Sequence, residues 1–145
     1  MSDIHIDDFY RDCALTFLRL YTVFPRKCIL YVDDITGPDE PDEFGLHSER
    51  FQAGFSTITW LADAGYIQYD EAIKHEALDQ AVLSQKAFMV LSSRSELNFG
   101  NADEDEDLPA SVMEQSRSNI NQLRKALKSG SSIMIKQCVQ YLLKQ

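Results

Sequence analysis

Apolar side chains near the start of the chain recur at intervals of three and four residues, a spacing that predicts a helix. Those on one side of this helix are Phe9, Cys13, Phe17, Leu20 and Phe24. Asp7 and Asp8 offer carboxylates to the first free amides, and Pro25 ends the helix because it has no N–H to donate. We therefore expect a first helix over residues 7–24.

A second, short helix is expected over residues 26–35, RKCILYVDDI. The following segment, TGPDEPDEFGLH at residues 36–47, contains Gly37, Pro38 and Pro41, which disfavour regular structure, and it predicts an irregular acidic loop. Ser48 then caps a third helix that runs to Ala64. Gly65 ends this helix, because glycine adopts a positive φ at little cost.

The pattern changes after the third helix from a helical period to short apolar runs. YIQYD at residues 66–70 predicts a strand, and ALDQAVL at residues 77–83 predicts a second strand after a turn. Ser84 is placed to cap a fourth helix over residues 85–94. Three helices, a two-stranded wing and a further helix are therefore expected in this order.

This order resembles that of the winged helix-turn-helix superfamily. The resemblance covers about residues 7–94 and is carried by WLADAGYI, where a helix closes on Leu61 and Gly65, and by AVLSQKAFMVL, where an apolar residue, Leu and Ser precede the last helix. It departs from the superfamily in the long loop before the third helix and in the acids of the wing. The resemblance implies a mostly α fold with a small β-hairpin wing, in a domain at residues 1–95.

Residues 96–110 carry many charges and predict a solvated acidic linker. Beyond it, residues 111–145 predict a C-terminal pair of amphipathic helices. The first, over residues 112–128, has an apolar arc of Val112, Met113, Ile120, Leu123 and Leu127 and an edge of Arg117, Arg124 and Lys128. The second, from Ser131 or Ser132, is apolar over more than half its circumference, so it must pack on the body, its neighbour or another chain.

Charge is unevenly distributed along the 145 residues, whose formal net charge is -9. Residues 1–100 hold 8 Lys and Arg against 17 Asp and Glu, and residues 101–107 hold 5 acids and no base. Residues 108–145 reverse the sign, with 6 bases and 1 acid. A uniform attraction to phosphate is therefore disfavoured, because nucleic-acid binding depends on Lys and Arg.

Other features of the sequence favour a globular protein of the cytoplasm. No apolar run approaches the roughly 20 residues needed to span a bilayer, and MSDIHIDDFYRD lacks the pattern of a signal or transit peptide. Cys13, Cys28 and Cys138 are odd in number and widely spaced, which favours reduced core thiols over disulfides or a zinc site.

The residues on the outer face of the third helix distinguish a DNA-binding function from a protein-binding one. We expect Phe55, Ile58 and Ala62 to face the core. The opposite face then holds Gln52, Ala53, Ser56, Thr57, Thr59, Trp60, Asp63 and Ala64. A major-groove reader usually presents Arg, Lys, Asn or Gln there. This helix offers one Gln, and its single basic residue is Arg50.

Trp60 has two interpretations: it is covered by the wing or the C-terminal helices, or it anchors a protein interface, where Trp is enriched. The interface would include Thr57, Ala53 and Ala64. The C-terminal helices add a second contact surface, whose basic rim would grip an acidic partner or a second copy. Its residues are Arg117, Arg124, Lys128, Tyr141 and Leu142.

Catalytic and metal-binding motifs are missing from the sequence, which contains no HxxxH, CxxC, GxSxG or phosphate-binding glycine loop. His5, His47 and His75 are scattered, and the acids of residues 33–43 do not match a calcium loop. We expect no catalytic residue, cofactor or metal.

The resulting hypothesis is a non-catalytic winged-helix protein, cytoplasmic and of bacterial type, that acts as an adaptor or regulatory subunit through protein contacts. Homodimerisation through the last helix is part of this hypothesis. The alternative is a DNA-binding transcription regulator with its contacts near Arg50, Gln52, Ser56 and Thr57.

Overall fold

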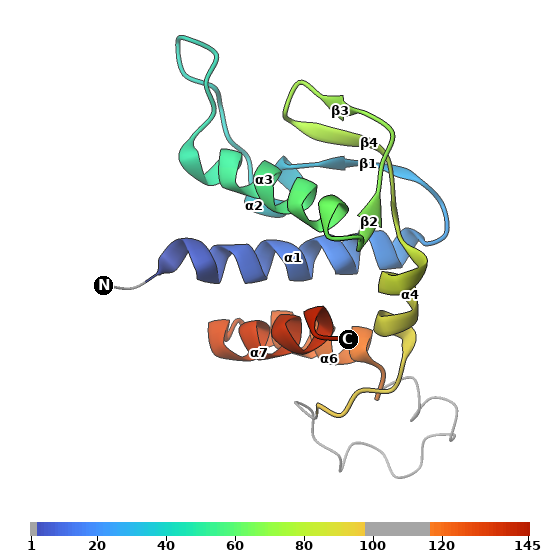
Figure 1. Ribbon diagram of the computed structural model, residues 1–145. Helices are drawn as coiled ribbons and strands as arrows, with labels where there is room; N and C mark the ends of the chain where they lie inside the picture. Colours follow the sequence, from blue (N-terminus) through green and yellow to red (C-terminus); the bar gives the residue numbers. More distant parts are fainter. Residues whose placement is uncertain (1–2, 98–116) are drawn as a thin grey trace.

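The computed structural model describes residues 3–97 and 117–145 and has an α+β fold (Figure 1). Its helices surround α1, Ile4–Val23, and a small antiparallel sheet lies on one side of this helix. In Figure 1, α3 lies above α1, and α6 and α7 lie below it. The expected first helix is therefore present, and it begins three residues earlier than predicted.

The segment at residues 26–35 is a strand followed by one helical turn, so the expectation of a second helix over this segment is wrong. Strand β1, Cys28–Tyr31, pairs antiparallel with a later strand, with Leu30 opposite Leu78. Helix α2, Asp33–Thr36, follows directly. Short apolar runs fit a strand or a helix equally well, and here the pairing across the sheet decides.

Three further strands complete the sheet: β2, Ile67–Gln68, β3, Ala72–Ile73, and β4, Ala77–Leu83. β4 is central, because β1 pairs with one side of it and β2 and β3 pair with the other, all antiparallel. The bounds of β4 match the expected strand at residues 77–83. The expected strand at residues 66–70 is shorter, and the chain bends before β3.

Helices α3, Glu49–Asp63, and α4, Gln85–Ser92, begin at the expected serines. Ser48 Oγ accepts a hydrogen bond from the amide of Phe51, and Ser84 Oγ accepts one from the amide of Ala87, each at 3.2 Å. Gly65 follows α3 with a φ of +88°, as expected for a glycine that ends a helix.

The C-terminal helices α6, Asn119–Ser129, and α7, Ser132–Leu143, pack on the body of the same chain. Leu123, Cys138 and Val139 are fully buried in one core with Phe17 of α1. The hydroxyl of Tyr66 also donates a hydrogen bond to the carbonyl of Leu143, at 2.9 Å. Ser131 caps α7 as expected. Most of the expected acidic linker, and Val112 and Met113, lie outside the described residues.

Candidate interaction surface on α1 and α3

The buried side of α3 is rotated from the expected one. Ile58 is buried as expected, but Phe55 and Ala62 are only partly buried, and Gly54 and Thr57 are buried instead. At Gly54 the helix lies so close to α2 that a Cβ atom would overlap the side chain of Thr36. α3 thus packs against both α1 and α2, and its buried arc is wide.

Thr57 is therefore not on the outer face, and this expectation is corrected. Its side chain is 5% exposed, and its hydroxyl donates a hydrogen bond to the carbonyl of Ala53 at 2.9 Å. A threonine with its hydroxyl satisfied in this way can be buried at little cost. The exposed face of α3 consists of Glu49, Gln52, Ala53, Ser56, Trp60 and Asp63.

Trp60 is 44% exposed and rests on an aromatic ring of α1. The rings of Trp60 and Phe9 meet edge to face with their centroids 5.2 Å apart, and Phe9 meets Tyr10 in the same way at 5.4 Å. Gln140 of α7 donates a hydrogen bond to the Tyr10 hydroxyl at 3.0 Å. We call Phe9, Tyr10 and Trp60 the aromatic patch. It connects α3, α1 and α7 and leaves much of the indole accessible.

Arg50 is held by two carboxylates of α1, and its side chain is 33% exposed. Its guanidinium donates two hydrogen bonds to Asp12, at 2.7 and 2.6 Å, and its Nε lies 3.5 Å from a carboxylate oxygen of Asp8. The Asp12 side chain is 1% exposed. Burial raises the pKa of Asp12, and the hydrogen bonds from Arg50 oppose that rise. This ion pair therefore joins α1 to α3.

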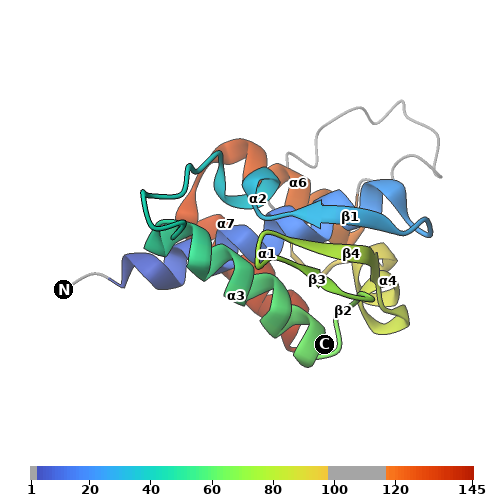
Figure 2. The ribbon, with the colours of Figure 1, turned by 90° about the horizontal axis from the view of Figure 1, so that it is seen from above.

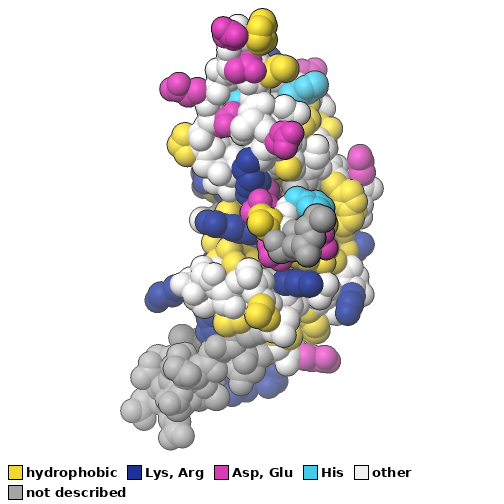
Figure 3. Space-filling model, turned by 90° about the vertical axis from the view of Figure 1, so that its left-hand side faces the viewer, with side chains coloured by type: hydrophobic (Ala, Val, Ile, Leu, Met, Phe, Trp, Pro, Cys, Tyr) yellow, Lys and Arg dark blue, Asp and Glu magenta, His cyan; other side chains and the backbone are white. Residues whose placement is uncertain are grey.

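The other polar residues considered for DNA contact offer little to a phosphate backbone. Gln52 donates its amide hydrogen to the carbonyl of His47 at 2.8 Å, and Ser56 is exposed. Residues 37–80, which hold the loop, α3, β2 and β3, contain ten Asp and Glu but two Lys and Arg. In Figure 3, acids occupy the upper end of the molecule, and most bases lie below. The surface around α3 is thus acidic.

His47 joins the acidic loop to the turn between β3 and β4, a connection that the sequence did not reveal. Its Nδ1 lies 2.8 Å from Asp39, its Nε2 lies 3.3 Å from Glu76, and its ring stacks on Phe51 at 3.8 Å. When both ring nitrogens carry hydrogen, the cationic imidazole can donate a hydrogen bond to each of these carboxylates. The hydrogen bond to Asp39 is the main reason why the pKa of His47 is raised. Hydrogen bonds from Ser48 and then His47 lower the pKa of Asp39.

These pKa shifts predict a pH window for the stabilisation by His47. Because the pKa of His47 is raised by folding, its contribution to the free energy of unfolding is complete below its ordinary pKa of 6.5. This contribution is lost as the pH rises through the raised pKa. A lowered aspartate pKa gives stability that is complete above 3.8 and is lost as the pH falls through the lowered value. We expect wild type to be more stable than His47→Gln in urea unfolding at about pH 5.5, and this difference to shrink by about pH 8.5. A pH-independent difference would contradict the cationic pairing.

The second set of expected contact residues lies apart from the aromatic patch. Arg117, Arg124 and Lys128 are exposed at or on α6, which Figures 1 and 2 place on a different side of α1 from α3. Tyr141 is half-buried, and Leu142, at 2% exposed, belongs to the core. The placement of Leu142 on a contact surface is therefore corrected: the apolar side of α7 is covered by α1 and α6 of its own chain.

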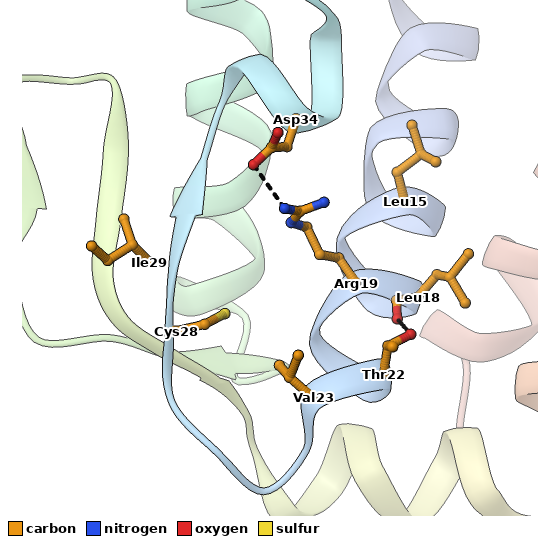
Figure 4. Close-up of a pocket in the computed structure, with 8 residues that line it drawn as sticks. All are labelled: Leu15, Leu18, Arg19, Thr22, Val23, Cys28, Ile29 and Asp34. Carbon is orange, nitrogen blue, oxygen red and sulfur yellow. Dashed lines mark hydrogen bonds and ion pairs between the residues drawn. The ribbon is translucent and has the colours of Figure 1, made fainter.

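A hollow of about 440 Å³ opens between α1, β1 and α2 (Figure 4). Its walls are mainly apolar, and at its rim Arg19 forms an ion pair with Asp34 at 2.9 Å. The described residues bring no three His, Cys, Asp or Glu side chains together as a metal site. All three cysteines are free, and burial raises the pKa of the Cys138 thiol to about 12.

No family model matches the sequence, and no match was found among curated proteins or among solved structures. Within residues 3–97 and 117–145, no helix combines the length and the apolar composition needed to cross a bilayer.

Proposed function

We propose that this chain is a non-catalytic winged-helix protein that acts through protein contacts, as an adaptor or regulatory subunit. The order of its elements supports the fold: α1, α2 and α3 precede an antiparallel hairpin of β3 and β4, and α4 follows. In this fold, α3 occupies the position of the helix that reads DNA in many DNA-binding proteins. The chemistry of α3 is therefore the informative feature.

The observation that carries the proposal is the engagement of Arg50, the one basic side chain of α3, by Asp12 and Asp8. A DNA reader needs cations that displace counterions from phosphates, and Arg50 could supply one only by leaving a buried carboxylate unpaired. Glu49 and Asp63 on the exposed face of α3 would instead face the phosphates. Both features favour a protein partner over a polyanion.

The aromatic patch supports a protein-binding role for this face. Trp60 presents an accessible apolar surface, is positioned by Phe9, and lies among small or acidic residues of α3. Aromatic anchors that are rigid before binding lose little conformational entropy when a partner covers them. We therefore propose Trp60 as the anchor of the interface, with Ala53 beside it and Ala64, half-buried, at its margin.

The alternative, a DNA-binding regulator of the same fold, is favoured by the order of the elements and makes an opposite prediction for DNA. Fluorescence anisotropy with mixed-sequence DNA fragments at low salt separates the two. The proposed adaptor should show no salt-sensitive binding. A regulator should bind clearly and lose affinity steeply as salt is added. Binding that weakens in Gln52→Ala and Ser56→Ala would overturn the proposal.

Replacing Trp60 with alanine should reduce partner capture from the native cell by about thirtyfold or more, the loss typical of an interface hot spot. Because the side chain is 44% exposed, we expect the free energy of unfolding to fall by only about 1 kcal/mol. The matched control is Met89→Ala, which removes an exposed apolar side chain from α4. Equal capture by wild type and Trp60→Ala would reject this anchor.

A further inference from the structure

The strand β1 is an edge of the sheet. It pairs with β4 on one side, and no strand of the described residues lies on its other side (Figure 2). Between Cys28 and Leu30 there is one residue, whereas between their partners Ala81 and Leu78 there are two, so the extra residue belongs to β4. β1 itself therefore remains regular, and a regular free edge is a template for a further strand.

Apolar side chains remain exposed on the outer face of β1. Ile29 is 41% exposed and Tyr31 is 48% exposed. Figure 4 shows Cys28 pointing from the strand toward α1, whereas Ile29 points to the other side. The hollow beside this strand is lined by Leu15, Leu18 and Val23 of α1. Both the strand and the helix beneath it thus present apolar surface.

Charges flank β1 with opposite signs. Arg26 and Lys27 precede the strand, and Asp33 and Asp34 follow Val32, so the segment RKCILYVDD has two bases at one end and two acids at the other. All four side chains are exposed. A strand with this pattern is complementary to an antiparallel copy of itself, whereas a parallel copy would bring like charges together.

We infer that a second copy of this chain covers the edge, with the two β1 strands paired antiparallel about a twofold axis at Leu30. A twofold axis perpendicular to the sheet leaves each side chain on the same face of the sheet. Paired residues must therefore both have odd numbers or both have even numbers. Centring the axis on Leu30 places Ile29 of each copy opposite Tyr31 of the other. It also brings Arg26 and Lys27, which precede β1 in one copy, toward the first turn of α2 in the other copy, where Asp33 and Asp34 lie.

This register accounts for the exposed groups. Ile29 and Tyr31 become cross-strand pairs of a β-branched and an aromatic residue, which stabilise antiparallel sheets. Asp34, already 2.9 Å from Arg19 of its own chain, then faces the basic end of β1 in the other copy. Side chains of α1 that line the hollow face the opposite copy across the axis. The inference does not depend on the proposed function, because the aromatic patch is separate from β1.

A charge-swap experiment tests the inference by sedimentation equilibrium of the full chain. Wild type should form a dimer. Arg26→Glu/Lys27→Glu makes both ends of β1 acidic, and Asp33→Lys/Asp34→Lys makes both ends basic, so each variant alone should dimerise with a dissociation constant about tenfold or more higher. An equimolar mixture of the two variants should recover a dimer, because opposite charges meet again.

Two further variants separate this surface from others and from effects on α2. Arg124→Glu/Lys128→Glu reverses two charges on α6 and should leave the dissociation constant unchanged. Ile29→Lys leaves α2 intact and should weaken the dimer. A wild type that remains a monomer at its highest soluble concentration would overturn the inference. A dimer that is weakened by the α6 variant but by none of the β1 variants would also overturn it. So would an equimolar mixture of the charge-swapped variants that stays monomeric although circular dichroism shows both variants to be folded.

Discussion

Replacing Arg50 with alanine should lower the free energy of unfolding by about 3 kcal/mol, because it leaves the Asp12 carboxylate buried without its cation. The Asp12 side chain is 1% exposed and accepts two hydrogen bonds from the guanidinium. Arg50 is the cation that forms an ion pair with Asp12, at 2.6 Å. Urea unfolding at neutral pH measures this loss.

The double variant Asp12→Ala/Arg50→Ala distinguishes a lost ion pair from lost packing. With both partners removed no charge is left buried, so the double variant should be clearly more stable than the sum of the single effects predicts. Lys136→Ala, which removes an exposed cation of α7, is the control and should change stability little. Additive effects of Asp12→Ala and Arg50→Ala would show that the two side chains are not coupled.

Replacing Leu142 with alanine should cost about 2–5 kcal/mol of unfolding free energy, the range for a leucine removed from a packed core. Leu142 is 2% exposed within the core that α7 shares with α1. If the last helix instead packed only against another chain, the loss would depend on protein concentration. We therefore expect the same loss in thermal or urea unfolding at low and high concentrations.

Ile133→Ala provides the matched control for Leu142, because Ile133 belongs to the same helix and is exposed. Its effect should be within about 0.5 kcal/mol. Equal losses for the two variants would contradict the described packing of α7 on α1.

Local signals in the sequence were sufficient for most of the helices. The serine caps at Ser48, Ser84 and Ser131 and the glycine at Gly65 act within a few residues of the chain, so their effects can be predicted without knowledge of the tertiary structure. β4 was equally predictable, since its apolar run has the length of a strand.

The sequence pattern did not predict features that depend on contacts between residues far apart in the chain. The segment that forms β1 has a composition that fits either structure, and only pairing with β4, some fifty residues later, makes it a strand. Thr57 was placed on the wrong side of α3, because the close approach of α2 at Gly54 widens the buried arc. In both cases tertiary contacts override the local pattern.

The features of the candidate site likewise separate into those that the sequence predicts and those that depend on tertiary contacts. The scarcity of cations on α3 is a property of the sequence and was correctly predicted. The capture of Arg50 by Asp12, 38 residues away, and the link of His47 to Glu76, 29 residues away, depend on the fold. The sequence left open whether Trp60 is covered; the structure leaves it half-exposed against Phe9.

The central position of α1 has a consequence for the newly made chain. Its buried side is shared between α3, which follows it closely, and α7, which is completed only near residue 143. While the ribosome is still making the later residues, the apolar stripe of α1 can be only partly enclosed. An intermediate that exposes such apolar surface is prone to aggregate. We therefore expect α1 to complete its packing only after the last helix has been made.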